Sequence, residues 1–467
     1  MWLKRVLAIL GYTLVVAGLA IGTFALVAYG NDYSYDFKTG KIIQNGHVII
    51  NSVPNGIRVE ADGKLLKKKT PYQAAYKVGE HTFALMKDGF WPWNKTLKVV
   101  AGQVNLVRYV IMVPKSPKTS VLDTRASIIA QSISKDHRHI AYVTGGTDAG
   151  LYTLDVGSTK PVKIFAAPLA TETTPAEVLT EVTWSDDASH LLVVSTANGV
   201  PVHRLLAANG NDEPVNLTAR YGFNFSGIRF SASNWRLLYW VSPDGLRRLD
   251  VGNQTISGVL APRVQQFWVE QDRVLYVQQT ALGKSLWSID NGGRTEELIQ
   301  VLPESDAYSV AFARYRGEDQ LAVVPAKTGT GTLYTGVFGD TPEAKTIAQG
   351  VTTASFSPDG QFLAMTAANK LVTYDLEQSF IFKKSVSYTV TDHPGKLVAL
   401  SWFDNHHILA NRDGKLYWSE FDGTNLVELG QAYGPFAGYG TADDRSVVTY
   451  RPDGGSGVRI TQLLIKQ

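Results

Sequence analysis

One strand–turn–strand unit recurs from about residue 120 to residue 467, and it constrains the fold more than any other feature. In each unit an apolar strand ends in a large residue, a turn rich in Ser and Asp follows, and a second apolar strand begins. The Ser-Pro-Asp-Gly turn at 357–360 is the clearest case. The units follow one another at intervals of roughly 37 to 51 residues, which is the period of propeller blades. The other turns, several of them degraded, lie at 134–136, 185–187, 231–233, 271–272, 318–319, 404–405 and 443–444.

A third strand follows the pair in most units, and this is the anatomy of a propeller blade. One such sheet is too small to bury both of its faces, whereas a ring of sheets buries all of them. We count eight units. The last unit is one strand short, and the segment 119–124 could supply that strand and close the ring. Residues 120–467 are therefore predicted to form an eight-bladed β-propeller, with seven blades and one irregular unit as the alternative.

The strand–turn–strand units resemble those of TolB-like and WD40-like propellers over about three quarters of the chain. A clear Gly-His and Trp-Asp pair is missing from every unit, so the TolB-like type is favoured. The resemblance implies binding through one face of the ring or through its central channel. Ser and Asp side chains cap tight turns by bonding to nearby backbone N–H groups. We therefore interpret the turn carboxylates as turn formers and not as catalysts.

Residues 46–113 hold a different pattern of short alternating strands separated by Gly and Pro turns. This pattern predicts a small antiparallel β-sandwich. It resembles the PEGA domain, a small surface module, which implies a cell-envelope setting and no particular chemistry. Asn55 and Ile57 stand where the name motif has Glu and Ala. The matching features are Ser52, the Pro-x-Gly turn at 54–56, Asp62-Gly63, Thr70-Pro71, Gly79-Glu80-His81, Gly89-Phe90, Trp93 and the strand that ends at Val110. We expect Trp93 in the core and Trp91 at the surface.

The N-terminal segment 6–29 carries no charged residue. At about 1.5 Å per residue a helix of this length crosses a hydrocarbon core of about 30 Å. Lys4 and Arg5 precede it, so we expect a cytoplasmic N-terminus and an extracytoplasmic remainder. A cleaved signal peptide is the alternative, but its apolar region would be roughly 7 to 15 residues. The predicted organisation is a transmembrane anchor at 1–30, a juxtamembrane spacer at 31–45, the sandwich at 46–113, a Pro-containing linker at 114–119 and the propeller at 120–467.

Composition excludes several classes of function. The chain has a formal net charge of +3, and its Lys and Arg residues are scattered, so nucleic-acid binding is not expected. The basic run at 67–69 is interpreted as a solvated turn, with contact to anionic lipid or wall polymer as the alternative. Cysteine is absent, which rules out disulfides, thiolate zinc sites and a Cys nucleophile.

Motifs that would indicate catalysis or a cofactor are missing from the sequence. There is no G-x-S-x-G elbow, no phosphate-binding Gly-rich loop and no H-E-x-x-H. His137 and His139 lie two apart and could share a strand face toward a metal, and His406 and His407 are adjacent. We favour polar rim residues for both groups. The carboxylate pairs 186–187 and 443–444 could bind calcium, but their turn positions favour the turn role. No catalytic residue, metal ligand or cofactor is therefore predicted, and no binding residue is assigned.

These features predict a membrane-anchored cell-envelope protein that presents a β-propeller for binding to an envelope protein or polysaccharide, and not an enzyme. The alternative is a propeller-type lyase or hydrolase that acts on envelope glycans or peptides. Titratable side chains that converge at the mouth of the channel would favour the enzyme. An aromatic or smooth polar mouth would favour binding.

Overall fold

The computed structural model describes the chain except for residues 1, 31–32, 37–39, 159, 173–174, 271–272, 291, 294–295, 340–341, 456 and 467. The described residues form two compact units, one of residues 1–117 with 465–467 and one of residues 118–464. The boundary after Pro117 falls inside the segment 114–119 that was predicted as a linker.

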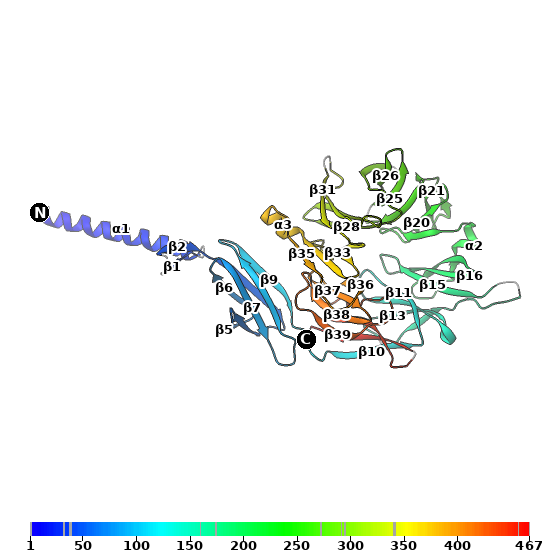
Figure 1. Cartoon of the computed structure of the whole chain (residues 1–467), viewed down its shortest axis with the longest axis horizontal. Helices are drawn as coiled ribbons and strands as arrows, with labels where there is room; N and C mark the ends of the chain where they lie inside the picture. Colours follow the sequence, from blue (N-terminus) through cyan, green and yellow to red (C-terminus); the bar gives the residue numbers. More distant parts are fainter. Residues whose placement is uncertain are drawn as a thin grey trace. The chain divides into compact units, whose positions relative to one another are not determined.

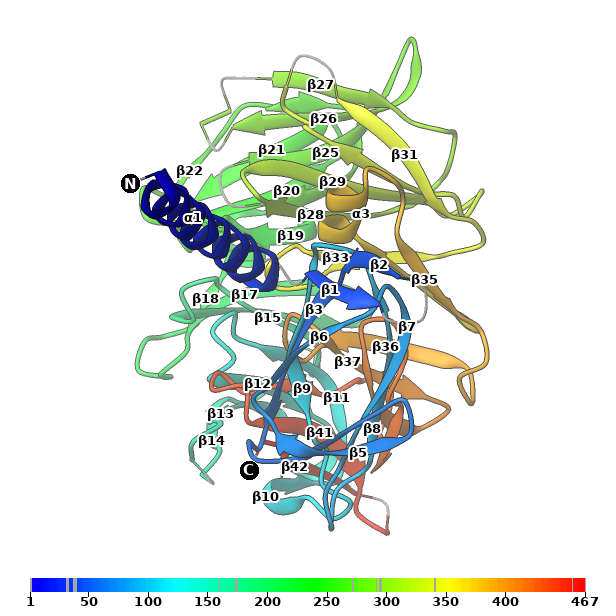
Figure 2. The same cartoon turned by 90° about the vertical axis from the view of Figure 1, so that its left-hand side faces the viewer.

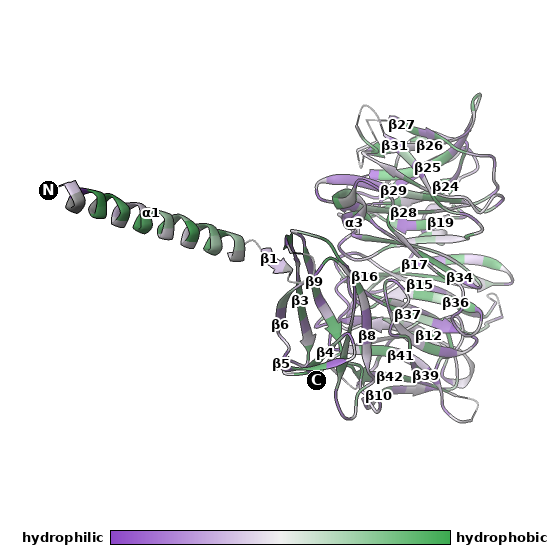
Figure 3. Ribbon diagram, turned by 60° about the vertical axis from the view of Figure 1, so that its left-hand side comes forward, coloured by the Kyte–Doolittle hydropathy of each residue, from purple (hydrophilic) through white to green (hydrophobic). Residues whose placement is uncertain are grey.

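Helix α1 (Trp2–Gly30) is the first element of the chain (Figure 1). Its segment Arg5–Ala28 is 24 residues long and has a mean hydropathy of 2.1. At about 1.5 Å per residue it measures roughly 36 Å, which exceeds a hydrocarbon core of about 30 Å. Hydrophobic residues run along its whole length (Figure 3). Within the described part of the chain it is the one helix long and apolar enough to span a membrane.

The predicted spacer is partly structured, because β1 (Tyr33–Asp36) and β2 (Lys41–Gln44) pair as an antiparallel hairpin. The sandwich that follows has two sheets. Its three-stranded sheet has the order β6-β3-β9 and its four-stranded sheet the order β5-β4-β7-β8. The strands are β3 (Gly46–Val53), β4 (Arg58–Ala61), β5 (Lys64–Lys69), β6 (Tyr72–Tyr76), β7 (Gly79–Met86), β8 (Trp93–Val99) and β9 (Val104–Ile111).

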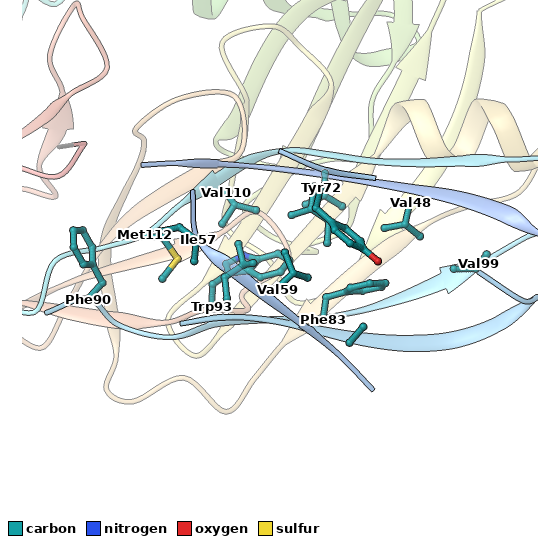
Figure 4. Packing of buried hydrophobic residues seen from close by; sticks show 14 residues of the cluster. Val48, Ile57, Val59, Tyr72, Phe83, Phe90, Trp93, Val99, Val110 and Met112 are labelled. Carbon is teal, nitrogen blue, oxygen red and sulfur yellow. The ribbon is translucent and has the colours of Figure 1, made fainter. Parts of the chain in front are cut away.

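One pair in this sandwich, β3 with β9, is parallel, whereas a wholly antiparallel arrangement was predicted. The chain leaves β3, builds the other sheet and returns beside β3 in the same direction, a long crossover that the local turn pattern does not reveal. The core lies between the two sheets. Val48, Ile50 and Phe83 are fully buried in it, and Trp93 is 3% exposed (Figure 4). Trp91 is 42% exposed, so both expectations for these tryptophans are confirmed.

The second unit contains eight sheets in its described residues, and each is built from strands that follow one another in the chain, apart from the last. The fold prediction of an all-β chain with an eight-bladed propeller is confirmed. Seven sheets begin with the strand nearest the N-terminus and add strands in order. The sheets along the chain are β11–β14, β15–β18, β19–β23, β24–β27, β28–β31, β32–β35 and β36–β39, and the eighth has the order β10-β42-β41-β40.

The bounds of these elements follow the apolar runs of the sequence. The first four sheets are formed by β11 (Ile128–Ile133), β12 (His139–Thr144), β13 (Gly150–Asp155), β14 (Val162–Phe165), β15 (Glu177–Trp184), β16 (His190–Ala197), β17 (Val200–Ala207), β18 (Val215–Asn216), β19 (Ser226–Phe230), β20 (Leu237–Ser242), β21 (Gly245–Asp250), β22 (Thr255–Ile256), β23 (Ala261–Pro262), β24 (Val264–Val269), β25 (Arg273–Thr280), β26 (Gly283–Asp290) and β27 (Glu296–Val301). The others are formed by β28 (Tyr308–Tyr315), β29 (Glu318–Pro325), β30 (Gly331–Thr335), β31 (Glu343–Ala348), β32 (Thr353–Phe356), β33 (Phe362–Ala367), β34 (Lys370–Asp375), β35 (Ser387–Val390), β36 (Leu397–Trp402), β37 (His407–Arg412), β38 (Lys415–Glu420), β39 (Val427–Gln431), β40 (Tyr439–Gly440), β41 (Ser446–Pro452), β42 (Val458–Leu464) and β10 (Lys118–Arg125). Short helices η1 (Gly146–Asp148), α2 (Leu217–Tyr221) and α3 (Leu376–Phe382) lie in connections between strands.

The ring is closed by its own first strand. β10, which contains the segment 119–124, pairs antiparallel with β42 and completes the sheet of the last blade (Figure 2). One apolar cluster joins that blade to the first one, since it contains Leu122 and Ile460 together with Tyr142 of β12. The closing strand that the sequence suggested is thus present, and the alternative of seven blades does not hold.

Candidate functional site

The turn between the first and second strand of each blade defines one end of the ring. In a propeller the first strand of every sheet lies beside the central channel, so these turns surround one mouth of that channel. They are the same turns that carry the Ser and Asp residues of the repeat. The chemistry available at this mouth therefore depends on whether those side chains are used within their own turns.

The turn at 357–360 shows how its polar side chains are used. The Ser357 hydroxyl donates to Oδ1 of Asp359 at 2.7 Å, and the N–H of Phe362 donates to the same hydroxyl at 3.0 Å. The N–H of Gln361 donates to Oδ1 of Asp359 at 3.1 Å. The same hydroxyl-to-carboxylate bond occurs in three further blades, between Ser134 and Asp136, Ser185 and Asp187, and Thr441 and Asp443. These carboxylates form turns, as we interpreted them from the sequence.

Burial alone would raise the pKa of Asp136, of Asp187 and of Asp443. The hydroxyl bonds and the backbone N–H bonds within each turn outweigh burial, so all three pKa values lie below the ordinary value. A carboxylate held ionised in this way has no proton to give at neutral pH. These three groups are therefore poorly suited to acid–base chemistry.

The other four blades depart from the pattern. The third pairs the hydroxyls of Ser231 and Ser233, and in the seventh Asp404 accepts from the N–H groups of residues 406 and 407. The fifth turn was predicted at Glu318 and Asp319, but both belong to β29, and the turn falls on Arg316 and Gly317 instead. Both of these residues have positive φ (53° and 83°), the geometry of a tight two-residue hairpin turn, which needs no Ser or Asp. In the fourth blade, residues 271 and 272 of the predicted turn lie outside the described residues.

Glu270, at the start of that fourth turn, is the residue that sequence reasoning missed. Its N–H donates to the carbonyl of Arg273, the first residue of the following strand. In the regular blades a buried hydroxyl residue makes this same backbone bond, as Ser134 does to His139 and Ser357 does to Phe362. A carboxylate has thus replaced the buried serine of the repeat.

The surroundings of Glu270 are titratable and charged. Burial raises the pKa of Glu270 to about 7, the charge of Lys135 opposes this shift and the charge of Asp186 adds to it. Lys135 and Asp186 belong to the turns of the first and second blades, and Nζ of Lys135 lies 2.5 Å from Oδ2 of Asp186. Charged side chains from three blades are therefore close enough at this mouth to affect one another's charge state. We call Lys135, Asp186 and Glu270 the mouth cluster.

The histidines singled out from the sequence do not join one site. His137 has φ of 58° and its Nδ1 lies 2.9 Å from the carbonyl oxygen of Gly440, while the ring of His139 lies 6.0 Å from that of Trp184. His407 is 1% exposed, with Nδ1 2.8 Å from Oδ1 of Asp404. It is a buried structural residue, so the expectation of a rim position is wrong for His407.

A metal site is not evident in the part of the chain that the structure describes. No group of three or more His, Asp or Glu side chains is close enough there to hold a metal ion. Of the carboxylate pairs considered for calcium, Asp186 pairs with Lys135, whereas Asp187 and Asp443 bond within their own turns. The expectation of no metal and no cofactor stays a prediction.

Comparison with known proteins identifies the class of both units. Residues 45–113 match the PEGA domain, so the resemblance read from the sequence is confirmed and its bounds agree with the sandwich at 46–113. No curated protein matches the chain as a relative.

Solved structures that share the fold are β-propellers. The structure of the Dos1 propeller is similar with a TM-score of 0.51 and 12% sequence identity, and the match covers 74% of this chain and 94% of that chain. A prolyl endopeptidase structure matches with a TM-score of 0.46 at 11% identity over 71% of this chain and 55% of that chain. The dihydro-heme d1 dehydrogenase NirN matches with a TM-score of 0.47 at 13% identity over 76% of this chain and 72% of that chain. At 12% identity the likeness to the Dos1 propeller shows the fold alone. The chain thus carries an apolar N-terminal helix, a PEGA domain and an eight-bladed propeller.

Proposed function

We propose that this chain is a membrane-anchored envelope protein whose propeller binds a protein or polysaccharide partner at the mouth of the ring that carries the mouth cluster. The observation that carries the proposal is the contrast between this cluster and its surroundings. The regular turn carboxylates are bonded within their own turns, whereas Lys135, Asp186 and Glu270 bring both signs of charge together from three separate blades. Loops that converge on a rigid scaffold are the usual place for such a site.

The proposed orientation places the N-terminus in the cytoplasm and both β units outside. Lys4 and Arg5 precede the uncharged run at 6–29, and positive charge on this side favours retention of the N-terminus in the cytoplasm. The PEGA domain supports an extracellular setting for the remainder. Protease added to intact, surface-accessible cells should digest everything after about residue 30. Protection of the ectodomain under these conditions would contradict the orientation.

Capture of partners from an envelope extract tests the binding proposal. The full chain in detergent is compared with the triple variant Lys135→Ala, Asp186→Asn, Glu270→Gln, and Glu343→Gln on the outer strand of the fifth blade is the control. We expect the wild type and the control to retain the same partner and the triple variant to lose it. Equal capture by the triple variant, folded by circular dichroism, would refute a partner site at the mouth cluster.

The enzymatic alternative draws on the same cluster, because titratable side chains that converge at the mouth are the feature expected of an enzyme. Binding is preferred as the proposal because Lys135 and Asp186 are engaged in an ion pair, which leaves Glu270 alone in the cluster for proton transfer. A carboxyl group with a pKa near 7 is suited to general acid–base catalysis, and Glu270 has such a pKa because of its burial. Under this alternative Glu270→Gln abolishes turnover of an envelope glycan or peptide and leaves its binding intact. Under the binding proposal no turnover is detected in the wild type. Assays of wild type and Glu270→Gln with the captured partner therefore separate the two functions.

A further inference from the structure

The outer face of the four-stranded sheet of the PEGA domain carries a groove of about 760 Å³. Val59 of β4 and Leu85 of β7 are fully buried on the inner face. Because side chains alternate along a strand, Arg58 and Glu60 face outward, and Met86, 55% exposed, does so beside them. The volume lies within the range of roughly 300–1,000 Å³ that is typical of ligand sites. The turn that carries the Pro-x-Gly signature forms one end of the groove through Asn55 and Gly56.

The groove is lined by more positive than negative charge. Its cations are Arg58, Lys69, Lys87 and Lys115, and its carboxylates are Glu60 and Asp88. No ion pair among the described residues involves any of these six side chains. On the propeller, by contrast, the buried guanidinium of Arg204 pairs with the carboxylate of Glu177.

Two of these cations oppose each other directly. Arg58 of β4 and Lys69 of β5 are cross-strand partners in the antiparallel register. Like charges in this arrangement destabilise a sheet. Lysines along an edge strand such as β5 protect it from pairing with other chains, but this explains neither Arg58 on an inner strand nor its opposition to Lys69. An anion bound between the two would convert the repulsion into attraction.

Aromatic and apolar surface lies next to these charges. Nζ of Lys87 is 4.6 Å from the centre of the Phe90 ring, and Nζ of Lys115 is 5.8 Å from the centre of the Trp91 ring. Pro92 lines the groove and is exposed, whereas Phe90 packs in the core and is 9% exposed. Trp91 lies between them and is 42% exposed. A ligand that combines negative charge with flat, weakly polar faces is complementary to such a surface, and sugar rings that bear carboxylates have both properties.

We propose that the groove binds an acidic polysaccharide, with a sugar carboxylate between Arg58 and Lys69 and the ring faces against Met86, Pro92 and the neighbouring Trp91. A guanidinium matches a carboxylate through two parallel hydrogen bonds, which an ammonium group cannot provide. This site is separate from the mouth cluster and does not depend on the function proposed for the propeller.

Calorimetry on the full chain in neutral detergent tests the site with a defined oligogalacturonate and a neutral dextran oligosaccharide of equal length as probes. We expect binding of the oligogalacturonate only, weakened by salt. Loss of one charge-assisted hydrogen bond weakens binding about tenfold or more, so Arg58→Gln with Lys69→Gln should remove most of the affinity. Lys64→Gln with Lys98→Gln, both on strands of the same sheet and absent from the groove lining, is the matched control and should bind like the wild type.

Stability distinguishes a binding role from a structural one. Because Arg58 and Lys69 repel each other, their double variant should unfold at the same or a higher denaturant concentration than the wild type while it loses the oligogalacturonate. Equal binding of dextran, tighter binding of inorganic polyphosphate, binding only to vesicles that contain anionic lipid, or no binding of oligogalacturonate at millimolar concentration would each overturn the proposal. Loss of stability in the double variant would show that the two charges serve the fold.

Discussion

Replacement of Leu122 by Ala should weaken the closure of the propeller. Leu122 lies on β10, at the irregularity in register between Val121 and Asp123, and it is 4% exposed. It packs in the cluster that joins the last blade to the first, together with Ile460 and Tyr142. The substitution therefore acts on the contact that holds the two ends of the propeller chain together.

The expected magnitude follows from the burial of this side chain. A buried methylene group contributes about 0.8 kcal/mol, and three carbons fewer correspond to a loss of about 2.4 kcal/mol in transfer free energy. A cavity that the neighbours fill incompletely adds to this loss, which places Leu122→Ala at about 2–5 kcal/mol. Val121 on the same strand is 48% exposed, so Val121→Ala should change the free energy of unfolding by only about 0.5 kcal/mol.

Denaturant unfolding of the full chain in detergent, followed by tryptophan fluorescence, measures both variants. Hydrogen exchange of the amides of β42 adds a local readout, since this strand pairs with β10 on one side. We expect faster exchange in Leu122→Ala and unchanged exchange in Val121→Ala. Equal stabilities within about 0.5 kcal/mol would refute the claim that β10 closes the ring through its buried side chain.

Three further perturbations test other parts of the structure by denaturant unfolding of the same preparation. Trp93→Ala should cost about 3–5 kcal/mol because Trp93 is 3% exposed, whereas Trp91→Ala should cost less than about 1 kcal/mol; similar losses would contradict the assigned burial. Burial raises the pKa of Glu270 from 4.5 to about 7, so the contribution of this side chain to stability is complete below about pH 4.5 and is lost as pH rises to about 7. Glu270→Gln should therefore flatten the dependence of the unfolding free energy on pH between these values. An unchanged pH dependence would refute the shift. A Cβ at Gly440 would meet the carbonyl oxygen of Phe403 at 2.5 Å, so Gly440→Ala should destabilise the last blade by a few kcal/mol. A Cβ at Gly455 meets nothing within 4 Å, so Gly455→Ala should leave the unfolding free energy unchanged.

The architecture of the propeller could be predicted because each blade repeats the same local information. A strand, a turn with Ser357 and Asp359, and another strand specify one hairpin, and the hairpin hides its faces only against neighbouring blades. The segment 119–124 could be predicted as the closing strand because the last unit, at the other end of the chain, is one strand short of a complete sheet. Local patterns did not reveal the parallel pairing of β3 with β9, because register between distant strands depends on the crossover between them.

The candidate sites were less accessible to sequence reasoning. His407 was grouped with possible rim residues, but a His at the start of a blade strand has the same appearance in sequence whether it faces the core or the solvent. Glu270 gave no signal that a sequence alignment would show: it lies three residues before Arg273, whereas Ser134 and Ser357 lie five residues before His139 and Phe362, and only the backbone bond reveals the correspondence. The groove had no such signal, since Arg58 and Lys115 belong to segments far apart in the chain.

In a repeat protein, residues that recur at one position of every unit are explained by the unit itself. The hydroxyl and carboxylate of each regular turn recur in this way, and their bonds within the turn give them a structural role. Function is to be sought at positions where one unit departs from the others at a cost in stability. Glu270 is such a position, because a partly buried carboxyl group replaces a hydrogen-bonded hydroxyl. The opposed charges of Arg58 and Lys69 are the equivalent in the PEGA domain. Local conflicts of this kind persist where a ligand resolves them.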